Sequence, residues 1–321
     1  MWRPSILSLV IDAAIHTSGL TKYYNHQIPA LESLDLVVRK GEVFGFLGPN
    51  GSGKSTTIRL LLGFLHPTAG SAQVLGLDIV RESVPIRRRI GYLPGGIALY
   101  DTLTGDQLLD YLGRLTGRPS VRRRELCERL ELSAATLKRL VRDYSRGMRQ
   151  KVGIVQALQH DPELAILDEP SEGLDPLMQR AFYDILDVLK RDGRTIFFSS
   201  HVLSEVERVC DRVAIVRQGK LVAVEETAAL LARRKRNVQI RFTGAAPRLE
   251  SVPGVSAIES SNGTGAPGVS GPSGPHYLRC RVEGDMRPFL AAIAEAGVED
   301  LTIEPARLED AFLELYEGGQ Q

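Results

Sequence analysis

Short apolar runs alternate with longer helical patterns along the first two thirds of the chain, up to about residue 220. The short runs have the length of buried strands, and the longer patterns repeat their apolar positions every three to four residues. Strands are predicted at 42–47, 165–167 and 195–199, and helices at 54–63 and 178–191. Alternation of this kind is typical of βα units, so the predicted fold class is α/β with a mainly parallel sheet.

A helical insertion is predicted at about residues 100–145. Residues 103–144 have a helical pattern rich in arginine, broken only at Gly113, Gly117 and Pro119. We therefore expect an inserted helical subdomain within the α/β domain.

The pattern changes beyond residue 219, where single apolar residues alternate with polar ones as in half-buried strands. Strands are predicted at 238–242, 255–259, 278–282 and 301–303, and helices at 289–296 and 308–316. These elements suggest β-α-β-β-α-β order closed by a helix. The expectation is a small ferredoxin-like α+β domain at residues 238–321.

Composition sets the remaining boundaries. Residues 260–276 hold five Gly, four Ser and three Pro, which cannot offset their ordering entropy by burial, so we expect a disordered hairpin loop there. A helical linker is predicted at 223–237, which leaves 15–222 for the first domain. Residues 1–14 contain a short apolar core ended by Asp12 and are interpreted as a leader or a first strand.

Length and charge narrow the class of protein. The 321 residues favour two domains, and a net charge of +1 gives no strong basic field, so we expect no nucleic-acid partner. Cys127, Cys210 and Cys280 lie far apart, which argues against a zinc site or a disulfide framework. Apolar runs are too short to span a bilayer.

The strongest chemical signal is a glycine-rich run between a predicted strand and a predicted helix. Its residues are Gly48, Pro49, Asn50, Gly51, Ser52, Gly53, Lys54 and Ser55, followed by Thr56. The run matches G-x-x-x-x-G-K-S, a loop whose backbone amides and helix N-terminus surround phosphates. We expect Lys54 to reach the β- and γ-phosphates and the Ser55 hydroxyl to bind Mg²⁺.

Two carboxylates follow a second buried strand. Asp168 and Glu169 come directly after apolar residues 164–167, and ligands bind at this end of strands in open α/β sheets. Asp168 is predicted to hold Mg²⁺, directly or through water, and Glu169 to polarise the attacking water. Without the phosphate loop, an Asp-Glu-Pro run would be read as a turn.

Phosphate loops also occur in GTPases and kinases, so other motifs must discriminate. No NKxD guanine motif is present, and Asp110 to Gly113 matches DxxG only inside the helical insertion. Three further motifs follow in order: Tyr144-Ser-Arg-Gly-Met-Arg-Gln150, Ser171-Glu-Gly-Leu-Asp175 and Ser200-His201. With these motifs, residues 15 to about 220 resemble the ATP-binding cassette family, the nucleotide-binding subunits of ABC transporters.

The resemblance implies roles for further residues. Tyr24, with Tyr23 as its competitor, would stack on adenine, and His201 would contact the γ-phosphate. Ser145 and Gly147 would bind the γ-phosphate of an ATP held by a partner subunit. Asp175 would organise the interface between the two subunits. A purely structural role is the alternative for each of these residues.

The chain departs from the family pattern at two places. Arg146 and Met148 occupy positions of the signature motif that usually hold Gly and Gln, and Gly95 and Gly96 stand where a metal-contacting Gln follows Gly-Tyr-Leu-Pro. How this chain would sense Mg²⁺ and couple to a membrane subunit therefore does not follow from the resemblance. Both departures, with a small domain that ends in a Leu-Glu-Asp-Ala-Phe run, resemble ATPase subunits of ABC-2-type exporters.

The resemblance implies an ATP hydrolase that uses ATP and Mg²⁺, dimerises head to tail, as a homodimer or with a sister subunit, and drives a separately encoded permease. Its place would be the cytoplasmic face of the membrane, as a peripheral subunit. The alternatives are a soluble ABC ATPase without transport and a regulatory module with an inactive site. The basic run 233–236 has two readings, a lipid or permease contact or a solvated helix end.

Overall fold

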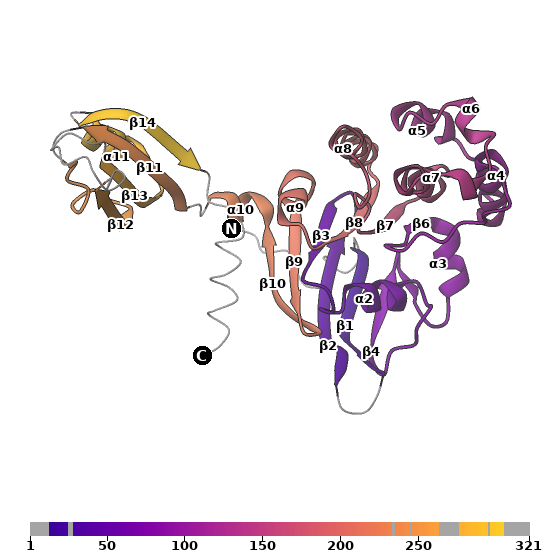
Figure 1. Cartoon of the computed structure of the whole chain (residues 1–321). Coiled ribbons are helices and arrows are strands. Elements are labelled where there is room, and N and C mark those ends of the chain that lie inside the picture. Colours follow the sequence, from indigo (N-terminus) through magenta and orange to yellow (C-terminus); the bar gives the residue numbers. More distant parts are fainter. Residues whose placement is uncertain are drawn as a thin grey trace. The chain divides into compact units, whose positions relative to one another are not determined.

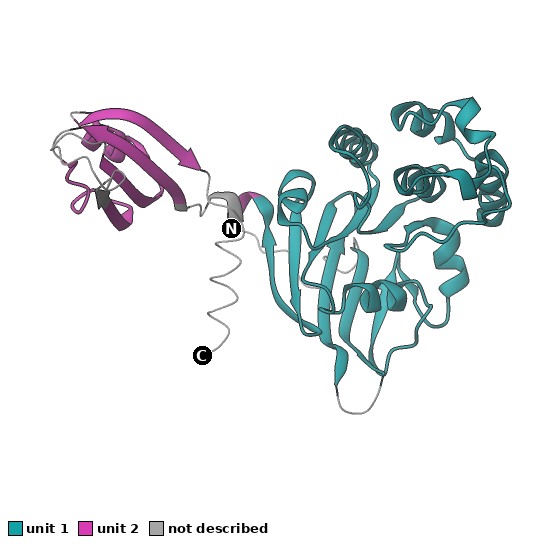
Figure 2. Ribbon diagram, viewed as in Figure 1, with its two compact units in different colours: residues 1–227 teal, residues 228–321 magenta. Residues whose placement is uncertain are grey.

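The computed structural model describes residues 13–24, 28–232, 235–243, 246–262, 276–294 and 296–304. The chain divides between Thr227 and Ala228 into two compact units (Figure 2).

The first unit combines strands and helices in alternation, and the predicted α/β class is confirmed (Figure 1). Its strands are β1 (Ala13–Tyr23), β2 (Pro29–Arg39), β3 (Val43–Leu47), β4 (Ala69–Val74), β5 (Leu77–Asp78), β6 (Ile90–Leu93), β7 (Leu164–Asp168), β8 (Thr195–Ser200), β9 (Arg212–Arg217) and β10 (Lys220–Glu226). Its helices are α2 (Lys54–Leu61), α3 (Ser83–Arg89), α4 (Gly105–Thr116), α5 (Arg123–Arg129), α6 (Ala134–Leu137), the 3₁₀ turn Val141–Asp143, α7 (Arg146–Leu158), α8 (Pro176–Arg191) and α9 (Leu203–Val209), and α10 (Thr227–Ala232) crosses the division.

Two sheets build this unit. A six-stranded sheet has the order β10-β9-β3-β8-β7-β6, parallel except for β10, and a four-stranded antiparallel sheet has the order β2-β1-β4-β5. The parallel strands all end at one edge, so residues that follow β3, β7 and β8 are brought together there.

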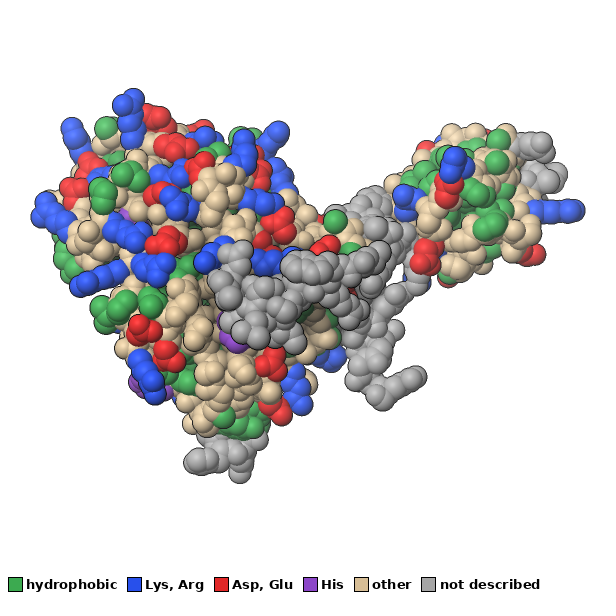
Figure 3. All heavy atoms as spheres, turned by 180° about the vertical axis from the view of Figure 1, so that it is seen from behind, with side chains coloured by type: hydrophobic (Ala, Val, Ile, Leu, Met, Phe, Trp, Pro, Cys, Tyr) green, Lys and Arg blue, Asp and Glu red, His purple; other side chains and the backbone are tan. Residues whose placement is uncertain are grey.

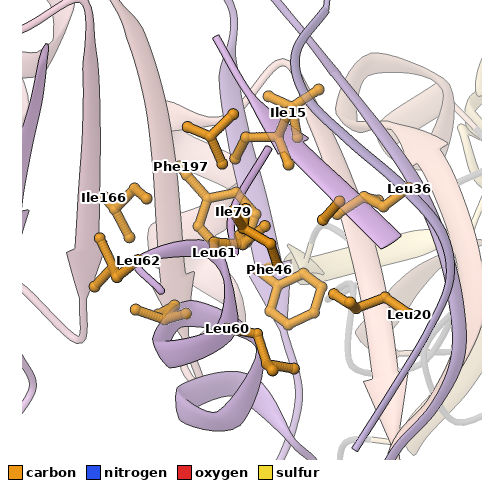
Figure 4. Packing of buried hydrophobic residues seen from close by; sticks show 14 of the residues in the cluster. Ile15, Leu20, Leu36, Phe46, Leu60, Leu61, Leu62, Ile79, Ile166 and Phe197 are labelled. Atoms are coloured by element: carbon orange, nitrogen blue, oxygen red, sulfur yellow. The ribbon is translucent and has the colours of Figure 1, made fainter. Parts of the chain in front are cut away.

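Helix α2 packs in the core between the two sheets (Figure 4). Leu60 and Leu61 of this helix share a buried cluster with Phe46 and Phe197 from the parallel sheet and Leu20 from the antiparallel one. On the opposite face of β3, a Cβ at Gly45 would lie 2.9 Å from a methyl group of Val206 in α9. The strand is covered on both faces, which explains why it reads as a continuous apolar run.

Between β6 and β7 the chain forms the helices α4 to α7. Thr104 and Gln107 form a capping box that starts α4. Many of the arginines nearby are paired: Arg122 with Asp161, and Arg123 with Asp106. On the face of the first unit shown in Figure 3, basic and acidic side chains are interspersed, in keeping with the near-neutral sequence.

The second unit is an antiparallel sheet with one helix in the described residues. Its elements are β11 (Lys235–Thr243), β12 (Val255–Asn262), β13 (His276–Glu283), α11 (Arg287–Ile293) and β14 (Gly297–Glu304), in the sheet order β12-β13-β11-β14. Phe242, Leu278 and Val282 form its core together with Phe289 and Ile293 of α11.

The small unit differs from the predicted β-α-β-β-α-β order at its first helix. Residues 246–254 between β11 and β12 form turns, because Pro247 and Pro253 interrupt a helix and Gly254 has a left-handed φ of 81°. Leu249 from this segment is buried in the core, so the turns take part of the place that a helix would occupy.

The predicted helical linker at 223–237 is also wrong in most of its length. β10 continues to Glu226 because it pairs with β9 and packs Leu221 and Val224 against the core. The helix spans only Thr227–Ala232, and β11 begins at Lys235.

Other predictions fall partly outside the described residues. Residues 1–12 of the predicted leader or first strand, residues 263–275 of the predicted loop and the predicted helix at 308–316 lie outside the described residues. The first two residues of the basic run at 233–236 also lie outside them. Residues 260–262 and residue 276 of the predicted loop belong to β12 and β13, which corrects both of its boundaries.

Candidate functional site

The phosphate loop connects β3 to α2, as its motif requires. Gly53 caps α2 with a left-handed φ of 107°, and a Cβ at Gly48 would lie 2.4 Å from the carbonyl oxygen of Val216. Side chains are therefore excluded at both positions. The first amides of α2 have no intrahelical acceptors and face the loop, which makes this end of the helix an anion site.

Lys54 is fixed to the backbone of its own loop. Its Nζ donates to the carbonyl oxygens of Gly48 at 2.6 Å and Pro49 at 3.2 Å and lies 3.8 Å from Glu169 Oε1. The side chain is 5% exposed, and this burial lowers the pKa of Lys54, although Glu169 and Asp168 act in the opposite direction. The ammonium is thus positioned between the loop and the two carboxylates.

Asp168 ends β7 and accepts hydrogen bonds on both carboxylate oxygens. Ser55 Oγ donates to Oδ2 at 3.1 Å, and Ser199 Oγ, from the neighbouring strand β8, donates to Oδ1 at 2.7 Å. The hydroxyl of Ser55 and the carboxylate of Asp168 are hard oxygen donors that fit Mg²⁺, which keeps several water or phosphate ligands and needs few from the protein. Within the described residues no cluster of three or more His, Cys, Asp or Glu side chains forms a metal site.

Glu169 and His201 face each other beside this pair. His201 Nδ1 lies 3.0 Å from Glu169 Oε1, and the Glu169 amide donates to Ser199 O at 3.0 Å. Glu169 has a φ of 49°, a left-handed conformation that is rare for a residue with a side chain. The turn re-aims the carboxylate away from the strand direction and toward His201 and Lys54.

Tyr24 lies against the start of α2. Its hydroxyl is 3.4 Å from Thr56 Oγ1, and its ring is 59% exposed with the Lys22 ammonium 5.9 Å from the ring centroid. Tyr23 lies within β1, and its amide donates to Thr68. Of the two candidates, Tyr24 is therefore the one whose hydroxyl contacts the phosphate-loop helix and whose side chain is largely exposed.

Ser145 and Asp175 lie at two helix starts that belong to one surface. Ser145 caps α7 and accepts from the Met148 amide at 3.2 Å, and Asp175 caps α8. Arg146 forms an ion pair with Glu172 of its own chain and remains 72% exposed. A Cβ at Gly147 would lie 3.0 Å from the carbonyl oxygen of Gly173, so the two segments are packed together.

The predicted site residues therefore form two groups. Lys54, Ser55, Asp168, Glu169 and His201 converge at the end of the parallel sheet. No hydrogen bond or ion pair of the described chain joins them to the second group, Ser145, Gly147 and Asp175.

Gly95 lies at the metal side of the first group. A Cβ there would be 3.4 Å from Asp168 Oδ2, whereas one at Gly96 would meet only open space. Position 95 is thus the one from which a side chain could reach the Asp168 carboxylate, and in this chain it carries none.

Three residues in contact with the site were not predicted from the sequence as site residues. Ser199 donates to Asp168, Gln150 Nε2 donates to Pro170 O at 2.6 Å, and Glu205 accepts from Ser171 and Ser200. Ser199 stands next to the Ser-His pair, which was the available signal. Gln150 and Glu205 contact the site through hydrogen bonds to Pro170, Ser171 and Ser200, and the spacing of the motifs does not predict these contacts.

Comparison with known proteins gives consistent matches. The family model described as ABC transporter matches residues 31–172. An uncharacterized ABC transporter ATP-binding protein of Synechocystis is 40% identical over 238 residues, which are 71% of this chain and 66%, just under two thirds, of that protein. The daunorubicin/doxorubicin resistance ATP-binding protein DrrA of Streptomyces peucetius is 35% identical over 312 residues, 94% of this chain and 92% of that one.

Among solved structures, an ATP-binding subunit of an ABC transporter superposes with a TM-score of 0.63 at 31% identity. The superposition covers 68% of this chain and 91% of the other. None of the helices in the described ranges has the length and apolar character needed to cross a membrane.

Proposed function

The chain belongs to the ATP-binding subunits of ABC transporters, and we propose that it hydrolyses ATP with Mg²⁺ to drive a separate membrane permease. The observation that carries this proposal is the convergence of Lys54, Ser55, Asp168, Glu169 and His201 at one end of the parallel sheet. A cation, two metal-binding oxygens and a carboxylate paired with an imidazole are the groups that phosphoryl transfer to water requires.

In this proposal each group has a separate task. The loop amides and Lys54 bind the β- and γ-phosphates, and Tyr24 stacks on the base. Ser55 and Asp168 hold Mg²⁺, which neutralises phosphate charge when it is bound. Glu169 orients and deprotonates the attacking water.

His201 contacts the γ-phosphate. Its ring is tied to Glu169 at 3.0 Å, so the two groups have a fixed mutual geometry before the substrate arrives.

The second group of residues supports a shared site. Ser145 and Gly147 lie at the start of α7, a helix N-terminus that can bind a phosphate, yet within the described residues no hydrogen bond or ion pair joins them to the phosphate loop of their own chain. Leu177, two residues after Asp175, is 75% exposed and is available for burial at a seam. We therefore propose that two copies associate head to tail, each closing the site of the other, with α4 to α7 as the inserted helical subdomain.

A groove of about 500 Å³ in the first unit supports the permease contact. It includes exposed Phe64 and Leu115 and residues 97–99, which directly follow Gly95 and Gly96 in the sequence. The apolar side chains that line it are Leu62, Phe64, Ile90, Tyr92, Leu93, Ile97, Ala98, Leu99, Leu112 and Leu115.

An apolar helix end of the permease would fit this groove, at the cytoplasmic face of the membrane. Because relatives over most of the chain are named for drug resistance, we propose export as the direction.

The proposed reaction is tested by phosphate release from ATP in the presence of Mg²⁺. Glu169→Gln keeps the size and hydrogen bonding of the side chain but removes the base, so turnover should fall by at least about a hundredfold while ATP still binds. Glu163→Gln, which replaces a carboxylate paired with Arg89 and Arg118, is the control and should keep its turnover. Equal turnover by the chain and its Glu169→Gln variant would contradict the proposal.

A further inference from the structure

Glu205 is a carboxylate whose two oxygens have different partners. It lies in the first turn of α9, where Oε1 accepts from Ser171 Oγ at 2.5 Å and Oε2 accepts from Ser200 Oγ at 2.8 Å. The side chain therefore bridges two segments that are 29 residues apart in the sequence and that meet only through the fold.

Ser200 directly precedes His201 in the sequence. It is the last residue of β8, and its hydroxyl also accepts from the Val202 amide at 2.9 Å, so the same oxygen closes the turn around His201. Ser200 O in turn accepts from the Gly48 amide at 3.4 Å. Ser200 therefore contacts both the turn that holds His201 and the start of the phosphate loop.

Ser171 belongs to the other segment. It follows Glu169 by two residues, and its carbonyl accepts from the Leu174 amide at 3.1 Å, which shapes the turn that leads to Asp175. On the far side of this turn, Arg146 of α7 pairs with Glu172. The segment from Ser171 to Asp175 therefore lies between α7, which Ser145 caps, and the carboxylate of Glu205.

A third partner ties in helix α8. Tyr183 of α8 lies beside Glu205, and burial together with the Glu205 charge raises the pKa of Tyr183. The Arg208 guanidinium lies 4.9 Å from the Tyr183 ring centroid and closes this cluster from the other side. The carboxylate is thus held by one donor from the loop after β7 and one from β8, beside Tyr183 of α8, which favours one fixed geometry.

We propose that Glu205 is a positioning residue that makes the His201 turn and the Ser171–Asp175 segment move as one body. Contact between His201 and the γ-phosphate would then be transmitted to the seam formed by Asp175 and Ser145, so that closure depends on ATP rather than ADP. This inference rests on the proposed function, because it assigns a task to residues around the same site.

The first test measures ATP and ADP binding by calorimetry with the full-length chain. In Glu205→Gln, ATP affinity should fall by about fivefold while ADP affinity stays within about twofold, because only ATP carries the phosphate that His201 contacts. In a His201→Ala background, Glu205→Gln should have no further effect on the ratio. Glu207→Gln, with the same charge change two residues along α9, should leave the ratio unchanged.

The second test uses the two serines. If Glu205 acts as a bridge, Ser171→Ala, Ser200→Ala and the double variant should lower turnover to a similar degree, since a bridge is broken by removing either end. A role in folding stability alone would give losses in Tm that add up, with an unchanged ATP-to-ADP affinity ratio.

The outcomes distinguish a failure of the proposed ATPase function from a failure of the role proposed for Glu205. Absence of ATP binding by the unmodified chain contradicts the proposed function itself. The role of Glu205 alone is overturned if the unmodified chain binds and hydrolyses ATP but one of two results is found. The first is an unchanged ATP-to-ADP affinity ratio in Glu205→Gln, and the second is a loss of turnover in the double serine variant equal to the product of the two single losses.

Discussion

The Lys54 ammonium lies between two loop carbonyls and two carboxylates. Burial disfavours its charged form, whereas the carboxylates of Glu169 and Asp168 stabilise that form. A phosphate that enters the loop adds negative charge at the point where the carbonyls of Gly48 and Pro49 now hold the side chain. Because the site is buried, the interaction with that phosphate is weakly screened. The lysine therefore binds charge more strongly than an exposed one would.

Replacing Lys54 should remove most of the nucleotide affinity. In Lys54→Ala the Kd for ATP should rise at least about tenfold, or about 1.4 kcal/mol, since backbone amides alone leave the γ-phosphate charge uncompensated. Calorimetry gives the Kd, and circular dichroism shows that the variant is folded. Lys220→Ala, at a side chain that is 65% exposed, is the control, and an unchanged Kd in Lys54→Ala would refute the assignment.

Single-residue predictions depended on motifs with a fixed spacing. The run from Gly48 to Ser55 and the pair Asp168 and Glu169 are readable because each follows a strand of the same sheet, and the structure brings them together. Glu205 could not be found in this way, since its partners come from two distant segments that only the folded chain brings into contact. The positive φ of Glu169 was equally hidden, because no sequence rule places a glutamate in that conformation.

At the scale of elements, α7 is held at both ends. Ser145 caps its start, and just beyond its end His160 Nε2 lies 3.1 Å from Ile90 O of β6. Because a carbonyl accepts, Nε2 carries the proton and Nδ1 of the neutral ring has none. Nδ1 is buried without a partner among the described residues, and burial lowers the pKa of His160 below its ordinary value of 6.5.

This buried imidazole should make stability depend on pH. Below about pH 6.5 the unfolded chain binds a proton at His160 that the folded chain does not, so the free energy of unfolding falls as pH decreases. His160→Gln keeps a donor for Ile90 O and removes this dependence. Urea unfolding at about pH 7.5 and pH 5.5 should show a larger loss for the unmodified chain than for the variant, and equal losses would contradict the account.

The strands were easier to predict from the sequence than the segments that connect them. Alternating apolar residues located β11, β13 and β14 of the small unit, because apolar side chains of each of these strands pack into or against its core. The first helix of that unit was expected from the β-α-β-β-α-β pattern, yet Pro247, Pro253 and Gly254 prevent it. The linker was misjudged for a related reason, since pairing of β10 with β9 overrides the helical reading of residues 223–226.

At the scale of the whole molecule, the two units have separate cores and every predicted site residue belongs to the first. A chain that ends at Ala232 keeps β10 and α10 and removes the second unit. It should bind ATP with a Kd within about twofold of the full-length value, as measured by calorimetry. Loss of binding by a truncated chain that remains folded would show that the second unit contributes to the site.

The arrangement of the first unit also supports the proposal that one copy is insufficient. The phosphate loop and the start of α7 are both shaped to bind phosphate, but they belong to different groups of one chain. Two identical copies related by a two-fold axis would bring each loop to the Ser145 of the other and form two equal sites. The sequence indicated this arrangement only through resemblance, whereas the geometry supplies an independent reason.

The most direct test of this shared site is light scattering during size-exclusion chromatography of Glu169→Gln with Mg-ATP. Because this variant binds ATP without cleaving it, the closed state should accumulate, and the mass should rise from 35.2 kDa to twice that value. Adding Ser145→Arg should place a bulky side chain in the seam and return the mass to that of one chain. A dimer that Ser145→Arg leaves intact would contradict the shared site.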